Sequence, residues 1–147
     1  PAVSAQVMTP LHEKDVDYVI DVGGDNVGTR VVGRFAEHFV EGEYDMFCVV
    51  NANREQTQTA EEVVRFIESM EATSKLKVTG LINNTHFIRQ TTVEDVLKGQ
   101  KLAKEVSKLT NIPIKYVSCL RELVDSLPDD LEGDILPIDL YMREEWM

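Results

Sequence analysis

A short stretch near the start of the chain carries the residue types best suited to chemistry. An apolar run ends at Asp21, and the chain then passes through Gly23, Gly24 and Asp25 into a helical pattern. Glycines let a backbone turn sharply and approach a phosphate, and a carboxylate at a strand's end can hold Mg²⁺ or its water ligands. The stretch therefore fits the active edge of a nucleotide-binding α/β protein. It equally fits an ordinary strand-to-helix turn in which Asp25 or Asn26 caps the helix.

Four β-rich apolar runs are predicted to be the strands that position these residues. They cover residues 18–21, 45–51, 77–84 and 113–118. Their interiors are almost continuously apolar, which suits strands buried on both faces of a parallel sheet. The carboxyl ends of parallel strands meet at one edge, where ligands bind in open α/β sheets. Polar residues end all four runs and are expected to converge there: Asp21, Asn51, Asn83 with Asn84, and Ser118.

Amphipathic segments between these runs predict helices. Val27, Val31, Val32, Phe35 and Phe39 recur at helical spacing in the first segment. The second is expected to begin at Thr59 and the third at Thr92, each with an acidic residue three positions later that can complete a capping box. Gly99 in the third helix can permit close packing. Alternating strands and helices predict one α/β domain over residues 1–147, with three layers and a mainly parallel sheet covered by helices on both faces. Residues 120–147 receive no firm assignment.

The composition excludes several classes of function. The formal charge of -11 disfavours broad attraction to nucleic acid or to an anionic membrane. The two cysteines, Cys48 and Cys119, lie within or at the end of apolar runs, which is typical of free thiols in a reducing compartment. No run is long enough to span a membrane. We therefore expect a cytoplasmic protein.

Two common phosphate-binding motifs are absent from this sequence. A Walker A loop needs a lysine after its second glycine, whereas Thr29 and Arg30 follow Gly28, and Asp25 would place negative charge inside the cradle. A dinucleotide fingerprint needs different glycine spacing and an acidic residue at the end of the second strand, where Asn51 stands.

Three segments resemble the later half of a ParA/MinD-type P-loop ATPase of the SIMIBI class. The segments are Asp-Tyr-Val-Ile-Asp-Val-Gly-Gly at residues 17–24, Val-Val-Asn at 49–51, and Gly-Leu-Ile-Asn-Asn-Thr-His at 80–86. Their order and spacing both fit, and the resemblance spans roughly residues 17–118. The last segment is the most specific of the three.

The resemblance implies roles for individual residues. Asp21 corresponds to the Walker B aspartate that holds magnesium, and Gly23 with Gly24 to a segment that senses the γ-phosphate. Asn84 corresponds to the adenine contact, and Asn51 lies on the same nucleotide-binding edge. Gly24 would direct a backbone amide at the γ-phosphate, and Asp25 could position water. The family also implies Mg-ATP as cofactor and an ATP-driven homodimer.

The chain departs from this family before Asp17, where nothing resembles the phosphate-binding strand and loop. We therefore expect the later portion of a longer nucleotide-binding domain, an ATPase when intact but inactive alone and without bound cofactor. In the family a further strand lies between the Walker B strand and the 45–51 strand. Without it, open strand edges predict a collapsed sheet or a strand-exchanged dimer. The alternatives are a non-catalytic module that docks a protein partner and a flavodoxin-like domain.

Overall fold

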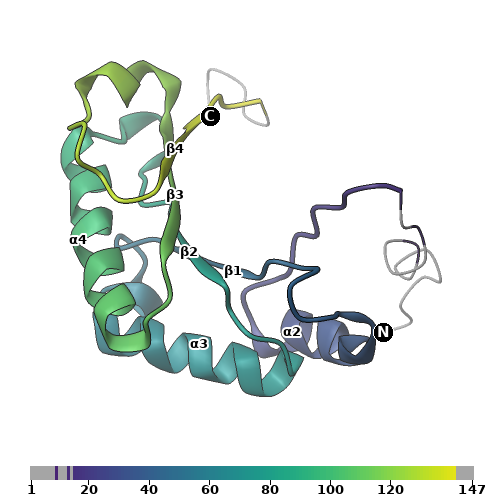
Figure 1. The fold of residues 1–147 in the computed structure, drawn as a ribbon. Helices are drawn as coiled ribbons and strands as arrows, with labels where there is room; N and C mark the ends of the chain where they lie inside the picture. Colours follow the sequence, from purple (N-terminus) through teal and green to yellow (C-terminus); the bar gives the residue numbers. More distant parts are fainter. Residues whose placement is uncertain (1–8, 10–12, 14, 142–147) are drawn as a thin grey trace. The chain divides into compact units, whose positions relative to one another are not determined.

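A four-stranded parallel sheet is the centre of the structure (Figure 1). The computed structural model describes residues 9, 13 and 15–141. Neighbouring strands follow each other in the order β1-β2-β3-β4, and every pairing is parallel. The α/β class predicted from the sequence is confirmed, and the architecture is consistent with a three-layer α/β fold. The strands are β1 (Phe47–Val50), β2 (Gly80–Asn83), β3 (Ile114–Leu120) and β4 (Asp134–Ile138).

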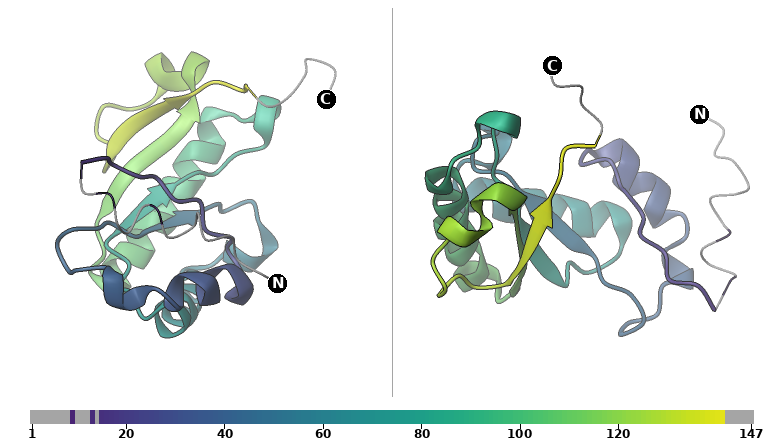
Figure 2. Two further views of the ribbon diagram at one scale, coloured as in Figure 1. Left: turned by 90° about the vertical axis from the view of Figure 1, so that its right-hand side faces the viewer. Right: turned by 90° about the horizontal axis from the view of Figure 1, so that it is seen from above.

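Helices connect the strands. The α-helices are α2 (Asn26–Gly33), α3 (Ala60–Ser74) and α4 (Val93–Thr110), and the 3₁₀-helices are η2 (Ala36–His38), η3 (Glu55–Thr57), η4 (Ile88–Gln90) and η5 (Arg121–Ser126). Helix α4 and η5 lie on the same side of the sheet (Figure 2). No helix in the described part of the chain combines the length and apolarity needed to cross a membrane.

The chain falls into two compact units. Residues 1–44 with 69–76 form the first unit, and residues 45–68 with 77–147 form the second. The second unit holds the whole sheet. That the chain forms a single domain stays a prediction.

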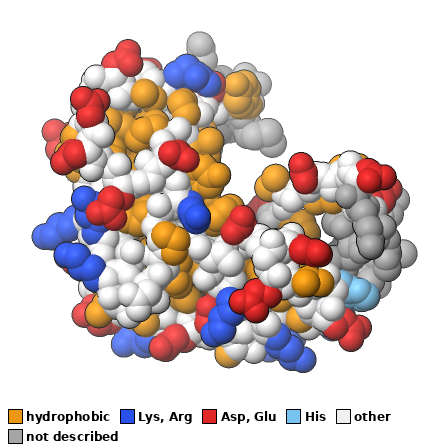
Figure 3. Space-filling view, in the orientation of Figure 1, with side chains coloured by type: hydrophobic (Ala, Val, Ile, Leu, Met, Phe, Trp, Pro, Cys, Tyr) orange, Lys and Arg blue, Asp and Glu red, His pale blue; other side chains and the backbone are white. Residues whose placement is uncertain are grey.

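One part of the core of the second unit lies between the sheet and α4. Val96 of α4 packs with Val117 and Cys119 of β3 in a buried cluster, against which Val124 and Leu127 are also packed. Hydrophobic side chains extend along the surface over the sheet, whereas charged side chains project from the region of α4 (Figure 3). Burial of the apolar surface explains why α4 stays on the sheet.

The prediction of a strand over residues 18–21 is wrong. These residues pair with no strand of the sheet, and they are exposed to solvent; Val19 is 102% accessible. A β-prone run becomes a strand only when a neighbouring strand satisfies its backbone groups. The sequence of this segment shows that it has a high β-propensity, but it does not show whether another strand lies beside it to pair with.

The tail that the sequence left unassigned contains the fourth strand. Gly133, at a φ of 95°, precedes β4, and Pro137 lies inside it. Proline argues against a central strand because it has no N–H for the ladder, but it is tolerated at an edge. Strand β4 is an edge strand. Pro137, which argued against a strand in the sequence, is therefore compatible with the position of β4 in the sheet.

Both predicted capping boxes are present. At α3 the backbone N–H of Glu62 donates to Thr59 Oγ1 (3.3 Å), and the N–H of Thr59 donates to Glu62 Oε2 (3.0 Å). The bond that the Thr59 N–H donates to the carboxylate is the main cause that lowers the pKa of Glu62. At α4 the same reciprocal bonds join Thr92 and Asp95, and the helix ends at Asn111 in the left-handed conformation (φ 59°). The predicted starts of these two helices are therefore confirmed.

Close packing at Gly99 is also confirmed. A Cβ at this position of α4 would overlap Asn83 Oδ1 and Thr85 Oγ1. Asn83, the last residue of β2, and Thr85, just after the strand, are both buried, and both make hydrogen bonds that hold them in place. The glycine thus sets how closely α4 can approach β2.

We expect Gly99→Ala to lower the free energy of unfolding by about 2 kcal/mol through overpacking. This would reverse the stabilisation of about 1 kcal/mol that alanine brings at an exposed helical glycine. Urea denaturation followed by circular dichroism measures the change. Lys101→Ala, at an exposed position of the same helix, should alter stability little. A Gly99→Ala protein as stable as the parent would show that α4 can move away from β2 at little cost.

Candidate functional site

Three of the predicted site positions meet at the carboxyl edge of the sheet. Ser118 Oγ in β3 donates to Asn84 Oδ1, just after β2, over 2.7 Å. The backbone N–H of Asn84 donates to the carbonyl of Val50, the last residue of β1, over 2.8 Å. Asn51 follows Val50 directly. The predicted convergence of polar residues from three strands is therefore observed for Asn51, Asn84 and Ser118.

Asn83 and Asn84 have different surroundings although they are adjacent. The Asn83 side chain is fully buried, donates to the carbonyl of Val96 in α4 (2.9 Å) and accepts from the Thr85 N–H (3.2 Å). Asn84 is only half-buried, and its Oδ1 is held by the Ser118 hydroxyl. Asn83 is therefore committed to packing, whereas Asn84 presents its amide nitrogen at the edge.

Asn51 builds the turn after β1. Its Oδ1 accepts from the Asn53 N–H (2.9 Å), and its carbonyl accepts from Thr57 Oγ1 (2.7 Å) and the Arg54 N–H (3.1 Å). An asparagine that bonds to the backbone two residues on forms an Asx-turn. The structure thus gives this predicted site residue a local structural role at the same edge as Asn84.

A polar bridge joins the loop after β1 to the start of α4. Asn53 Nδ2 donates to Asp95 Oδ1 (3.0 Å), while Lys98 Nζ donates to Asn53 Oδ1 (2.9 Å). Asp95 Oδ2 also accepts from the backbone N–H and the hydroxyl of Thr92. Although burial alone would raise the pKa of Asp95, the bonds from Thr92 and Asn53 and the nearby Lys98 charge lower it. This bridge was not predicted from the sequence, because its partners are more than 40 residues apart.

The loop between β2 and α4 holds an unusual backbone conformation. Ile88 has a φ of 53°, which a β-branched residue rarely adopts. Thr91 supports the turn, since its Oγ1 donates to the Ile88 carbonyl (2.6 Å) and accepts from the Phe87 N–H (2.9 Å). The Phe87 side chain is 55% exposed. A bulky aromatic residue is therefore displayed on a braced loop beside the carboxyl edge.

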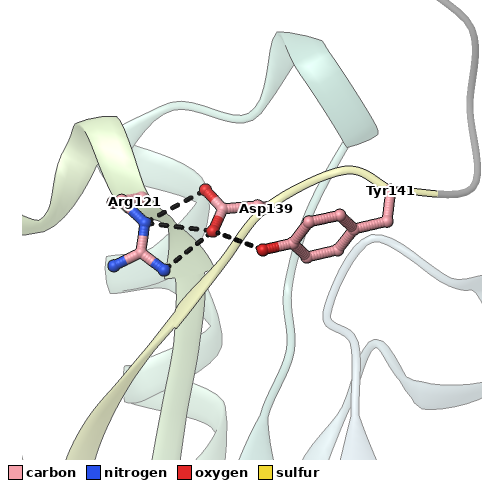
Figure 4. Close-up of polar contacts among 3 residues, drawn as sticks. All are labelled: Arg121, Asp139 and Tyr141. Atoms are coloured by element: carbon pink, nitrogen blue, oxygen red, sulfur yellow. Dashed lines mark hydrogen bonds and ion pairs between the residues drawn. The ribbon is translucent and has the colours of Figure 1, made fainter.

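A pocket lies where β3 and β4 end. Its volume is about 480 Å³, and it is lined by Arg89, Leu120, Arg121, Glu122, Ile138, Asp139 and Leu140. Arg121 pairs with Asp139 through Nε and through Nη2, the latter at 2.7 Å, and Tyr141 Oη donates to the same carboxylate at 3.1 Å (Figure 4). The guanidinium of Arg121 is the main cause that lowers the pKa of Asp139.

Sequence analysis missed this pocket because most of its lining comes from the unassigned residues 120–147. A usable signal did exist. Gly133 and Asp134 precede the short apolar run Ile-Leu-Pro-Ile at residues 135–138, and a run with one proline is typical of an edge strand. The match between Arg121 and Asp139 depends on the pairing of Leu120 with Ile138, which sequence alone does not give.

The other predicted site residues lie in the first unit. Asp25 Oδ1 accepts from the backbone N–H groups of Val27 (3.1 Å) and Gly28 (2.8 Å) and so caps α2. Gly23 lies against Gly28 so closely that a Cβ on Gly28 would be 2.6 Å from the Gly23 carbonyl. Asp21 and Gly24 are exposed. The alternative expectation of a capped turn is met, while the catalytic roles of Asp21, Gly24 and Asp25 stay predictions.

An apolar pocket of about 350 Å³ also lies in this unit. Asp21 and Gly23 line it together with residues of α2 and of the segment after it, among them Val31, Phe35 and Phe39. Helix α2 ends at Gly33, earlier than the apolar pattern through Phe39 predicts, and η2 follows. Asp21 is the only acidic residue in the lining. Among the described residues, no group of three or more His, Cys, Asp or Glu side chains could hold a metal ion.

The predicted site residues are thus divided between the units. Asn51 and Asn84 share the sheet edge of the second unit, and Asp21, Gly23, Gly24 and Asp25 follow one another in the first. No family model, curated protein or solved structure matches the chain.

We expect Asn53→Ala to raise the pKa of Asp95 toward its ordinary value of 3.8, because the variant removes a hydrogen bond to the charged form. A lowered folded-state pKa stabilises the protein above pH 3.8, and this contribution is lost as the pH falls through the folded-state value. The variant should therefore be less stable than the parent at neutral pH, with the difference shrinking in acid. Carboxyl-carbon NMR titration of Asp95 measures the pKa directly. Gln56→Ala, an exposed change in the same connection, is the control, and an unchanged Asp95 titration in Asn53→Ala would contradict the assignment.

Proposed function

We propose that the carboxyl edge of β1, β2 and β3 binds the base of a nucleotide, as part of a ParA/MinD-type ATP-binding protein. The observation that carries this proposal is the fixed side chain of Asn84. Ser118 Oγ bonds to Asn84 Oδ1 over 2.7 Å and also to the Asn83 carbonyl over 3.2 Å. Nδ2 then has two hydrogens that bond to no described residue. A half-buried amide donor at the ligand-binding edge of a parallel sheet suits the ring-nitrogen acceptors of a purine.

The pocket at the ends of β3 and β4 supports the same proposal. Its volume of about 480 Å³ lies within the usual range for small-molecule sites. Leu120, Ile138 and Leu140 supply apolar surface for the faces of a planar ring, and Glu122 and Asp139 supply acceptors for an exocyclic amine. Leu120 follows Ser118 by two residues on the same strand, so the pocket and Asn84 belong to one edge.

The phosphate side of the site is assigned through the resemblance. Asp21 would hold magnesium, the Gly23 and Gly24 amides would face the γ-phosphate, and Asp25 would help position water. Bound magnesium neutralises charge on the phosphate oxygens and polarises them. The 147 residues contain no Gly-Lys-Ser/Thr loop. Because such a loop supplies most phosphate contacts, we propose that this chain alone neither binds ATP tightly nor hydrolyses it.

A cytoplasmic location accompanies this proposal. Cys48 and Cys119 are both free and buried, and burial raises the pKa of the Cys48 thiol to about 12. Protonated, buried thiols suit a reducing compartment and a packing role.

The proposal predicts that adenosine and ATP bind this chain with similar, weak affinity. The expected dissociation constants are about 1 mM or weaker, because only base contacts contribute. Amide chemical shifts of the isotope-labelled chain, titrated with each ligand in the presence of Mg²⁺, measure both affinities. The shifts should centre on Asn84, Ser118 and the ends of β3 and β4. Micromolar ATP binding, or shifts confined to other regions, would contradict the proposal.

Asn84→Asp is the decisive variant because it replaces the amide donor by a charged acceptor of the same shape. We expect adenosine binding to weaken about fivefold or more. Asn111→Asp makes the same chemical change at an exposed position before β3, away from the carboxyl edge, and should leave binding unchanged. Equal affinities for the parent and Asn84→Asp would remove Asn84 from the site.

A non-catalytic module that docks a basic protein partner is the second candidate. The 26 acidic against 15 basic residues favour it, as does the missing phosphate loop. Such a module would give no adenosine-dependent shifts at the carboxyl edge, so the titration above separates the two candidates.

A further inference from the structure

Strand β1 is an edge of the sheet in the described part of the chain. It is the first strand in the sheet order and pairs only with β2 among the described strands. The Val50 carbonyl accepts from the Asn84 N–H on the β2 side. Because backbone groups of successive residues alternate in direction along a strand, those of Phe47 and Val49 point away from β2. They bond to no described residue.

The two edges of the sheet differ in chemistry. Strand β4, the other edge, carries Asp134 and Pro137, and both residue types discourage the addition of a strand. Strand β1 reads Phe-Cys-Val-Val, with neither a charge nor a proline, and its Val49 side chain is 53% exposed. An unprotected apolar edge is a template for another strand, so a pairing partner is expected at β1 and not at β4.

A matching segment is exposed in the same chain. Residues 16–20 read Val-Asp-Tyr-Val-Ile, and Val16, Tyr18, Val19 and Ile20 are all among the exposed large hydrophobic residues. The backbone groups of this segment bond to no described residue, and among the described side chains Tyr18 donates one hydrogen bond to Glu13. Its β-branched and aromatic composition is typical of strands. Its length is comparable to that of β1.

We propose that residues 16–20 of one copy add as a strand to the β1 edge of a second copy, and that the exchange is reciprocal. Each pairing would satisfy backbone groups of Phe47 and Val49 on one copy and of the exposed segment on the other. A two-fold dimer follows, because the same two surfaces meet twice. A second copy is the partner best supported by the structure, since one sequence supplies both the open edge and a segment able to cover it. The proposal does not depend on nucleotide binding.

Charge gives this dimer a recognisable salt dependence. Each copy carries a formal charge of -11, so the two copies repel each other at low ionic strength. Backbone pairing and apolar contact are not weakened by screening, whereas the repulsion is. Association should therefore strengthen as salt is added, unlike a dimer held by ion pairs.

Sedimentation velocity across a protein concentration series tests the proposal on the 147-residue chain. We expect a monomer–dimer equilibrium that shifts toward dimer when sodium chloride rises from about 50 to about 500 mM. Val19→Lys and Val49→Lys should each raise the dissociation constant at least about tenfold, because each puts a charge into the new pairing. Both side chains are exposed, so circular dichroism should confirm that the variants keep the parent's fold.

Val40→Lys is the matched control, since it adds the same charge at another exposed valine outside both segments, and it should dimerise like the parent. Val49→Pro is a second test, because it removes an outward N–H without touching the bonds to β2. A chain that stays monomeric at several hundred micromolar would overturn the proposal. A dimer that Val19→Lys and Val49→Lys do not weaken, or weaken no more than Val40→Lys, would overturn it as well.

Discussion

The bond from the Asn83 side chain to the Val96 carbonyl is the constraint around which the second unit is organised. It joins β2 to α4 inside the core, where neither partner can bond to water instead. Leaving a buried amide unpaired costs about 1–3 kcal/mol. This cost holds α4 at one distance from β2 and in one rotation about its own axis. Gly99 makes that depth possible, because any larger side chain would overlap Asn83 and Thr85. The loop that follows β2, with Asn84 and Ile88, starts from this fixed point.

Asn83 is buried and hydrogen-bonded in the core, whereas the adjacent Asn84 can face a ligand. Successive residues of a strand point to opposite faces, so the chain can bury Asn83 and present Asn84 one position later. The Ser118 hydroxyl then orients Asn84 from the adjacent strand. Precise sites are more readily built from rigid elements than from loops, and here two strands and their shared core supply the rigidity. The carboxyl edge is thus a preorganised polar surface, whichever ligand it serves.

Local patterns predicted the local structure well. The spacing of Thr59 with Glu62 and of Thr92 with Asp95 placed two helix starts, since a capping box needs only four consecutive residues. The buried strands β1, β2 and β3 were recognisable as continuous apolar runs. The run at residues 18–21 has the same local character but lacks a neighbouring strand in the structure, and a propensity scale carries no information about neighbours. For the same reason the Asn53–Asp95 bridge and the Arg121–Asp139 pair could not be predicted, because register and topology bring these partners together.

The purely parallel sheet also has a consequence for how the chain reaches its structure. Phe47 pairs with Gly80, Leu81 with Ile114, and Tyr116 with Asp134. No two of the described strands are therefore joined by a tight hairpin, and each ladder forms only after the helical segment between its strands. Closing such a long loop costs conformational entropy before the strands form their stabilising hydrogen bonds. Parallel topologies therefore fold slowly. During synthesis β1 emerges first and must remain unpaired until β2 and the intervening α3 have followed. The chain is therefore most prone to aggregation during its synthesis, before β2 is available. A chaperone that binds the nascent chain would bind β1.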